Sequence, residues 1–213
     1  MKRVINLDNW NRKEHFKFFS ALDDPFWGIT TTVDFTSIYQ QSKNMEVSFF
    51  LYSVHFLLKC INATTAFKLR IENGEVVEYD KINISPTIGR EDGTFGFGFF
   101  EYDTDLSLFI ENAEKEIHRV KNSTGLSFSK DTARADVIRY SALPWFAFSE
   151  MKHAGSIQTG DSIPKISTGK LIQEKKKLLL PISISVHHGL VDGRNVAEFI
   201  QNVKGGIAAV YCS

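Results

Sequence analysis

Two adjacent histidines, His187 and His188, are the residues of this chain best suited to chemistry. A neutral imidazole at a strand end is a good general base, because its unperturbed pKa lies near physiological pH. Asp192 follows four residues after His188. The residues alone allow a general base, a metal site of both histidines and Asp192, or a structural corner. Adjacent strand residues diverge, which argues against the metal site and leaves the base and the corner open.

The segments on either side must position these histidines. Residues 178–186 are β-branched and nearly alternating, which predicts a strand. We expect His188 on the buried face of that strand and His187 on the opposite face, because His188 shares its parity with the apolar residues Ile182, Ile184 and Val186. Apolar residues recur at helical spacing between 196 and 203, and Asp192 stands at the N-cap position of the helix they predict.

The pattern His-His-x-x-x-Asp-Gly, from His187 to Gly193, resembles the C-terminal motif of the chloramphenicol acetyltransferase family. It resembles more distantly the catalytic domain of the dihydrolipoyl acyltransferases, and the resemblance spans nearly the whole chain. It implies that His188, the second histidine, is the general base, oriented by its own backbone carbonyl. It also implies that Asp192 has a structural role and pairs with an arginine of the N-terminal helix instead of forming a dyad with His188.

The N-terminal segment carries a second part of the resemblance. Residues 10–19 predict a helix that, judged by its residues alone, is an amphipathic surface helix. Its Trp-x-Arg-Lys-Glu-His-Phe pattern resembles the family's N-terminal motif, which implies that Arg12 is the partner of Asp192. The same resemblance implies that Phe18 and Phe19 lie beside the acceptor pocket. Thr94-Phe95 matches a family pair that contributes a pocket aromatic, here Phe95.

Two further motifs concern the reaction itself. Residues 138–148 predict a strand broken at Pro144, in which Ser141 alone would be an ordinary turn serine. Ser-Ala-x-Pro-Trp, from Ser141 onward, resembles the family, which implies that the Ser141 hydroxyl donates to the oxyanion of a tetrahedral intermediate. Residues 162–170 resemble it too, which implies that Ser167 holds a water near the intermediate and that Lys170 lies near the coenzyme.

Composition bounds the class of protein. The chain has 213 residues, of which 43% are hydrophobic, and 25 basic residues balance 25 acidic ones. This composition suits one domain over residues 1–213, and it shows no excess of positive charge of the kind that nucleic-acid binding requires. We find no apolar run long enough to span a membrane and no signal-like N-terminus. With Cys60 and Cys212 as its cysteines, we expect free thiols and a cytoplasmic protein.

The resemblance implies an α/β two-layer sandwich in which a mixed sheet is covered by helices. It implies acetyl transfer from acetyl-CoA, without a metal, to the primary hydroxyl of chloramphenicol, which inactivates the antibiotic. The partners expected are therefore a small-molecule alcohol and, as in the family, two further copies of the chain in a homotrimer with active sites between subunits. Leu171 stands where relatives have a tyrosine, which weakens the expected adenine contact.

Three other interpretations stay open at this point. The first is a dihydrolipoyl acyltransferase core. The second is an acyltransferase of the same fold that uses another alcohol or thiol acceptor, and the third is a non-catalytic module on this scaffold. The absence of a lipoyl domain and of a Pro/Ala-rich linker from the sequence argues against the first. Thiol release from acetyl-CoA with different acceptors separates the other two.

Overall fold

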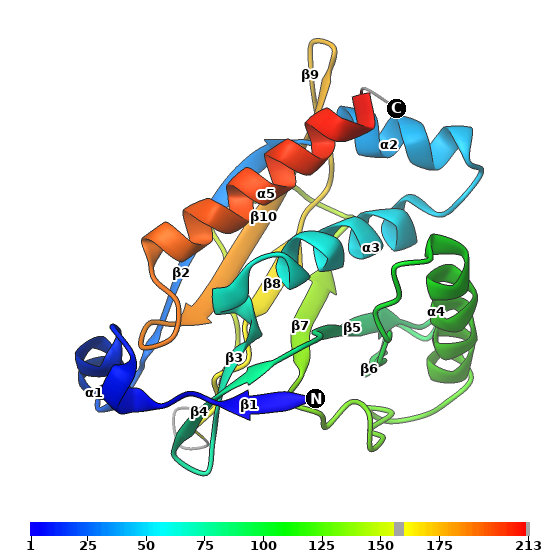
Figure 1. Cartoon of the computed structure of the whole chain (residues 1–213). Coiled ribbons are helices and arrows are strands. Elements are labelled where there is room, and N and C mark those ends of the chain that lie inside the picture. Colours follow the sequence, from blue (N-terminus) through cyan, green and yellow to red (C-terminus); the bar gives the residue numbers. More distant parts are fainter. Residues whose placement is uncertain (156–159, 212–213) are drawn as a thin grey trace.

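The computed structural model describes residues 1–155 and 160–211. Within these residues a mixed seven-stranded sheet has the order β2-β10-β8-β7-β5-β6, with β9 paired to β10. Helices pack over it, which confirms the expected two-layer α/β arrangement (Figure 1). The strands of this sheet are β2 (Phe26–Asp34), β5 (Asn83–Gly89), β6 (Phe95–Phe97), β7 (Val137–Ala142), β8 (Lys165–Thr168), β9 (Ile172–Glu174) and β10 (Lys177–His187).

A small antiparallel sheet and the helices complete the described part of the chain. The small sheet comprises β1 (Lys2–Val4), β4 (Glu75–Tyr79) and β3 (Leu69–Glu72), and Asn73-Gly74 turns β3 into β4 with positive φ at both residues. The helical elements are η1 (Leu7–Asn9), α1 (Lys13–Ser20), α2 (Thr36–Asn44), α3 (Phe49–Asn62), η2 (Thr65–Lys68), α4 (Leu106–Lys121) and α5 (Gly193–Tyr211).

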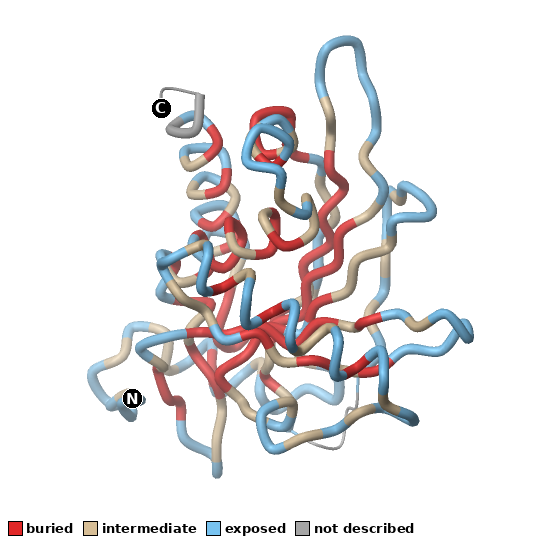
Figure 2. Tube along the Cα trace, turned by 90° about the vertical axis from the view of Figure 1, so that its right-hand side faces the viewer, coloured by how far each residue is buried: buried red, intermediate tan, exposed pale blue. Residues whose placement is uncertain are grey.

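Strand β10, with 11 residues, is the longest strand of the large sheet. It pairs antiparallel with β2 on one side and with β8 on the other, and β8 runs parallel to β7. Its alternate residues Ile182, Ile184 and Val186 are fully buried, as the alternating pattern predicts. Helices α3 and α5 lie across this face (Figure 1), and Figure 2 shows the buried residues concentrated along the strands and on the helix faces that meet them.

The helix boundaries follow from local capping. Ser48 caps α3, and Asp105 accepts hydrogen bonds from two backbone N–H groups of α4, as expected for these residue types. The N-terminal helix is shorter than the sequence predicts. It begins at Lys13, not Trp10, because Leu7–Asn9 form a separate 3-10 turn that Asn6 caps.

The cysteine and membrane expectations concern separate parts of the chain. Cys60 is a free thiol on α3, and burial raises its pKa to about 12, so it stays protonated at neutral pH. Cys212 lies outside the described residues. Among the helices that are described, none combines the length and the apolar character that crossing a membrane requires.

Candidate functional site

The two histidines lie at the end of β10 and face different surroundings. After His187 the chain reverses, and the backbone N–H groups of Leu190 and Val191 both donate to the carbonyl of His187 at 3.0 Å. The N–H of His188 donates to the carbonyl of Pro25 at 2.8 Å. His187 is buried on the face of the sheet away from the helices, and His188 is half-buried on the other side. The two side chains and Asp192 therefore do not converge on one point.

The His188 ring is held by aromatic neighbours. Phe19 of α1 stacks on it with a centroid separation of 3.8 Å, and Trp27 of β2 lies 5.4 Å away. Its Nδ1 atom is buried and has no hydrogen-bond partner among the described residues. The His188 carbonyl accepts a hydrogen bond from Arg12 Nη2 at 3.3 Å, so packing, together with this backbone contact, positions the imidazole.

Arg12 and Asp192 form an ion pair that joins α1 to the turn after β10. The Asp192 carboxylate also accepts hydrogen bonds from the backbone N–H groups of Arg194 and Asn195, and so caps α5. Burial alone would raise the pKa of Asp192, but the hydrogen bond from Asn195 and the Arg12 guanidinium hold it below its usual range. Asp192 is therefore ionised at neutral pH and fixes the turn that carries His188.

His187 has the environment of a neutral imidazole. Burial lowers its pKa to about 4, with the nearby His188 acting in the same direction and Asp161 acting against it. Its Nδ1 accepts a hydrogen bond from the N–H of Gly189 at 3.2 Å, which leaves Nε2 as the N–H donor. A group with so low a pKa is a weak proton acceptor at neutral pH, so His187 is poorly suited to be the base.

A row of three serines crosses the face of the sheet opposite the helices. Ser141 of β7 is in register with Ser167 of β8, which is in register with Ser183 of β10, so their side chains share that face. The hydroxyl of Ser141 lies 3.1 Å from that of Thr87. The hydroxyl of Ser167 is buried and lies 3.0 Å from His153 Nε2. Ser141 and Ser167, both expected at the site, therefore lie side by side.

Ser141 and His188 are far apart within one chain. Two strand spacings separate β7 from β10, and five residues along β10 separate Ser183 from His188. At about 4.8 Å per strand and 3.3 Å per residue, the two residues lie roughly 20 Å apart. A base and an oxyanion donor that act on one tetrahedral intermediate must each lie within about 3 Å of the reacting atoms. His188 and Ser141 of the same chain are therefore too far apart to act together on one intermediate.

The three phenylalanines expected at the acceptor pocket are also divided. Phe18 is largely exposed on α1, where its ring meets Phe19, so both lie at the His188 end. Phe95 is half-exposed on β6 and packs against Phe97, whose ring stacks on Phe128. In Figure 1, α1 lies at the left of the molecule and β6 lies in its right half, beside α4. One chain therefore does not bring the three aromatic rings together.

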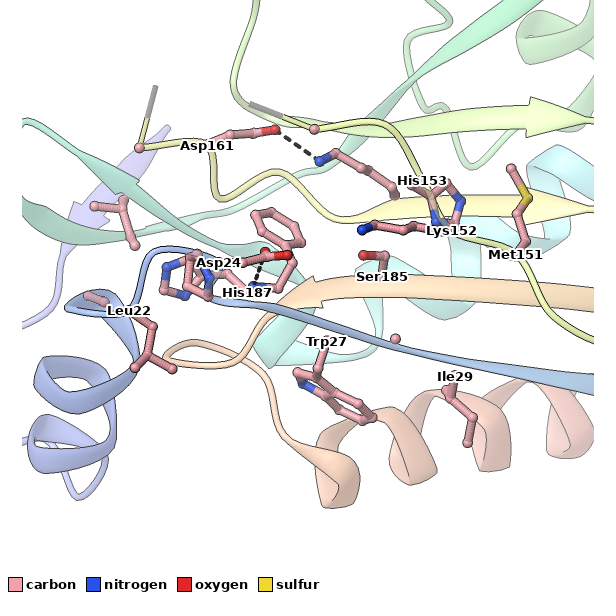
Figure 3. Close-up of a pocket in the computed structure, with 18 of the residues that line it drawn as sticks. Leu22, Asp24, Trp27, Ile29, Met151, Lys152, His153, Asp161, Ser185 and His187 are labelled. Carbon is pink, nitrogen blue, oxygen red and sulfur yellow. Dashed lines mark hydrogen bonds and ion pairs between the residues drawn. The ribbon is translucent and has the colours of Figure 1, made fainter. Parts of the chain in front are cut away.

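A cavity of about 800 Å³ opens on the same face of the sheet as the serine row. Figure 3 shows Ser185 and His187 of β10 on one side of it and His153, from the loop after β7, on another. Lys165 and Asp161, whose side chains are 6% and 7% exposed, line it as well and form an ion pair of 3.3 Å. No local pattern in the sequence marks His153, Asp161 or Lys165, and they become neighbours only through the fold.

Lys170, expected near the coenzyme, lies on the surface just after β8. Its backbone N–H donates to the carbonyl of Phe146 at 2.9 Å, and its side chain is exposed. Leu171 packs against the core beside it. The described residues contain no cluster of three or more histidine, cysteine or acidic side chains arranged to hold a metal ion.

Residues 2–204 match the family model described as chloramphenicol acetyltransferase. The chain belongs to the chloramphenicol acetyltransferase family. Chloramphenicol acetyltransferase 3 of Escherichia coli is 27% identical over 201 residues, which cover 94% of each chain. A chloramphenicol acetyltransferase of Clostridioides difficile is 28% identical over 204 residues, which cover 94% of this chain and 93% of the relative. This family membership identifies the chain as an acyltransferase enzyme.

Solved structures give the same fold. A chloramphenicol acetyltransferase superposes with a TM-score of 0.89 at 29% identity, over 97% of this chain and all of the other. A dihydrolipoamide acetyltransferase of Azotobacter vinelandii superposes with a TM-score of 0.69 at 14% identity, over 93% of this chain and 88% of the other. The second likeness is one of fold, which agrees with the more distant resemblance expected from the sequence.

Proposed function

We propose that this chain moves the acetyl group of acetyl-CoA to the primary hydroxyl of chloramphenicol, which would inactivate the antibiotic. The proposal rests chiefly on the family match over residues 2–204, and it is supported by relatives of 27% and 28% identity that carry the name chloramphenicol acetyltransferase. We further propose that residues 1–213 act as one acetyltransferase domain in the cytoplasm, where acetyl-CoA is the co-substrate.

In the proposed mechanism His188 removes the proton of the acceptor hydroxyl as oxygen attacks the acetyl carbonyl. Such a base contributes roughly a hundred- to ten-thousand-fold to the rate. Stacking on Phe19 supports this role, since it fixes the imidazole plane without consuming either ring nitrogen. The proton then passes from His188 to the departing coenzyme A thiolate as the tetrahedral intermediate collapses, so no acyl-enzyme is needed.

Ser141 is proposed to donate its hydroxyl hydrogen to the oxyanion of that intermediate. The Thr87 hydroxyl lies within hydrogen-bond distance of Ser141 and can accept or donate, so it is suited to orienting the serine before the reaction. Ser167, in register beside it, supports a water-mediated role near the same oxygen. Lys170, exposed at the end of β8, is proposed to contact the coenzyme phosphates as a cation.

We propose that the site is completed between subunits of a homotrimer, with His188 from one copy and Ser141 from its neighbour. The separation of roughly 20 Å within one chain supports this arrangement, because no rotamer change closes such a distance. Phe18 and Phe19 lie with His188, whereas Phe95 lies in the part of the large sheet that carries Ser141. A neighbouring copy is therefore also needed to gather the proposed acceptor aromatics.

The deciding experiment measures thiol release from acetyl-CoA by the purified protein with chloramphenicol and with other alcohols and thiols. Chloramphenicol-dependent release, with acetate found on the primary hydroxyl, supports the proposal. Release with dihydrolipoamide instead would favour an acyltransferase-core function. If calorimetry detects no acetyl-CoA binding and no acceptor gives release, the non-catalytic alternative takes its place.

A further inference from the structure

The polar and charged side chains that line the cavity beside the serine row indicate which kind of acceptor would bind there. We infer that the preferred acceptor alcohol carries a polyhydroxylated, saccharide-like portion, which occupies the cavity next to Lys165, Asp161 and His187. This inference rests on the proposed acetyl transfer and narrows its acceptor, with chloramphenicol as a weakly bound member of the accepted range.

The cavity lies close to the proposed oxyanion donor. Lys165 is in register with Arg139 on one side and with Ser185 on the other, two residues along from the row of Ser141, Ser167 and Ser183. Side chains two residues apart on a strand share a face and lie about 7 Å apart. An acceptor whose hydroxyl reacts beside Ser141 can therefore reach this cavity with its remaining atoms.

In the ion pair that lines the cavity, Asp161 has more hydrogen-bond partners than Lys165. The Asp161 carboxylate accepts from Arg139 at 2.9 Å and from the N–H of Ile163 at 3.0 Å, and it also meets Lys165 Nζ at 3.3 Å. Lys165 is only 5% exposed. Among the described residues its charged partner is Asp161, while the ring of Phe26 lies 4.2 Å from Nζ. Lys165 therefore keeps donors available to a molecule in the cavity.

The histidines of the cavity add neutral hydrogen-bonding groups. His187 keeps an Nε2–H donor, because its Nδ1 accepts from Gly189. His153 contacts Ser167 through Nε2, and its buried Nδ1 has no partner among the residues described. Asp24, Ser185 and the exposed Lys152 line the cavity as well, so both acceptors and donors face it (Figure 3).

This lining suits hydroxyl groups better than an apolar ring. A hydroxyl both donates and accepts, so several on one molecule can meet a carboxylate, an ammonium group and an imidazole together. An apolar group in the same place would strip water from Lys165 and leave its donors unmet, which is costly for a buried charge. Phe26 offers an apolar surface of the kind on which a sugar ring packs, and it lies directly against Lys165.

The test compares acceptors that differ in the polyol portion. Binding of phenyl glucoside, maltose, 2-phenylethanol and chloramphenicol is measured by calorimetry, and thiol release from acetyl-CoA is measured with each. We expect phenyl glucoside to bind more tightly than 2-phenylethanol and to give a higher kcat/KM than chloramphenicol. Weaker or equal binding of phenyl glucoside and maltose relative to 2-phenylethanol would overturn the inference, whether or not turnover is seen.

Substitution of Lys165 gives a second readout. We expect Lys165→Met to raise KM for phenyl glucoside by about tenfold or more with kcat little changed, and to leave KM for chloramphenicol equal or lower. Lys165→Gln serves as a smaller change if the methionine variant melts early, and Lys176→Met, on the exposed turn before β10, is the matched control. Equal shifts for both acceptors would contradict the inference. Chloramphenicol turnover without sugar binding would contradict the saccharide inference but not the proposed acetyl transfer. Absence of acetyl-CoA binding would contradict the proposed function itself.

Discussion

The Phe19 ring lies face to face with the His188 imidazole, with centroids 3.8 Å apart and ring planes inclined by 12°. Trp27 closes a second side of the imidazole, and the Nδ1 atom is enclosed without a hydrogen-bond partner among the described residues. The position of the proposed base therefore depends on an aromatic wall and on the turn that Asp192 caps. This relationship makes substitutions around His188 informative about its role.

The first prediction separates the two histidines. His188→Ala should lower kcat by about a hundred- to ten-thousand-fold while the circular dichroism spectrum is retained, because the base is lost from a half-buried position. His187→Asn, at the adjacent position, should lower kcat far less, because His187 is neutral and weakly basic. Steady-state kinetics on both purified variants measure the difference. Equal and modest losses would argue against His188 as the base.

The second prediction concerns the serine row. Ser141→Ala should lower kcat by roughly a hundred- to a thousand-fold with KM little changed, because an oxyanion donor acts mainly on the transition state. Ser183→Ala is the matched control, since it removes a hydroxyl from the same row and face. The two variants are compared in one thiol-release assay. A KM effect alone at Ser141 would indicate a binding role instead.

The third prediction tests the pair of Arg12 and Asp192. Their side chains are 17% and 34% exposed, so the pair is only partly buried and Asp192 also caps α5. Asp192→Ala should destabilise the fold by about 2 kcal/mol, through loss of a cap and of a partly shielded ion pair. Asp192→Asn retains a capping side chain and should cost less. Chemical denaturation measures both, and lost activity with unchanged stability would argue for a direct catalytic aspartate.

The fourth prediction follows from the pKa of His187, which burial lowers from an ordinary 6.5 to about 4. The unfolded chain binds the proton more readily than the folded one, so the free energy of unfolding should fall as pH falls from 6.5 to 4. The contribution of this residue is on the order of 3 kcal/mol. His187→Asn should flatten this part of the profile relative to His15→Asn, an exposed control on α1. Identical pH profiles for the two variants would contradict it.

Local patterns predicted much of the fold. The parity of β10 correctly puts His187 and His188 on different sides of the sheet. However, β10 ends at His187, and His187 is the buried histidine whereas His188, expected on the buried face, is only half-buried. The turn at Asn73-Gly74 and the cap at Asp105 appear as expected. These features depend on neighbours in sequence, which a pattern records. The start of α1 was wrong because Asn6 caps a separate turn, a competition between two capping choices that the residue types alone do not decide.

The cavity could not be predicted in the same way. Its lining comes from β2, the loop after β7 and the end of β10, and Lys165 meets Phe26 only because three strands lie side by side. The contact between Arg12 and the His188 carbonyl likewise joins residues that lie 176 positions apart in the sequence. Long-range contacts of this kind leave no periodic trace in the sequence.

The distance of roughly 20 Å between Ser141 and His188 within one chain has a genetic consequence if the site forms between copies. A chain without His188 still supplies a serine, and a chain without Ser141 still supplies a histidine. Two alleles, each inactive alone, would complement each other inside one cell, with about one quarter of the sites intact after random mixing. A double mutant on a single allele would rescue neither.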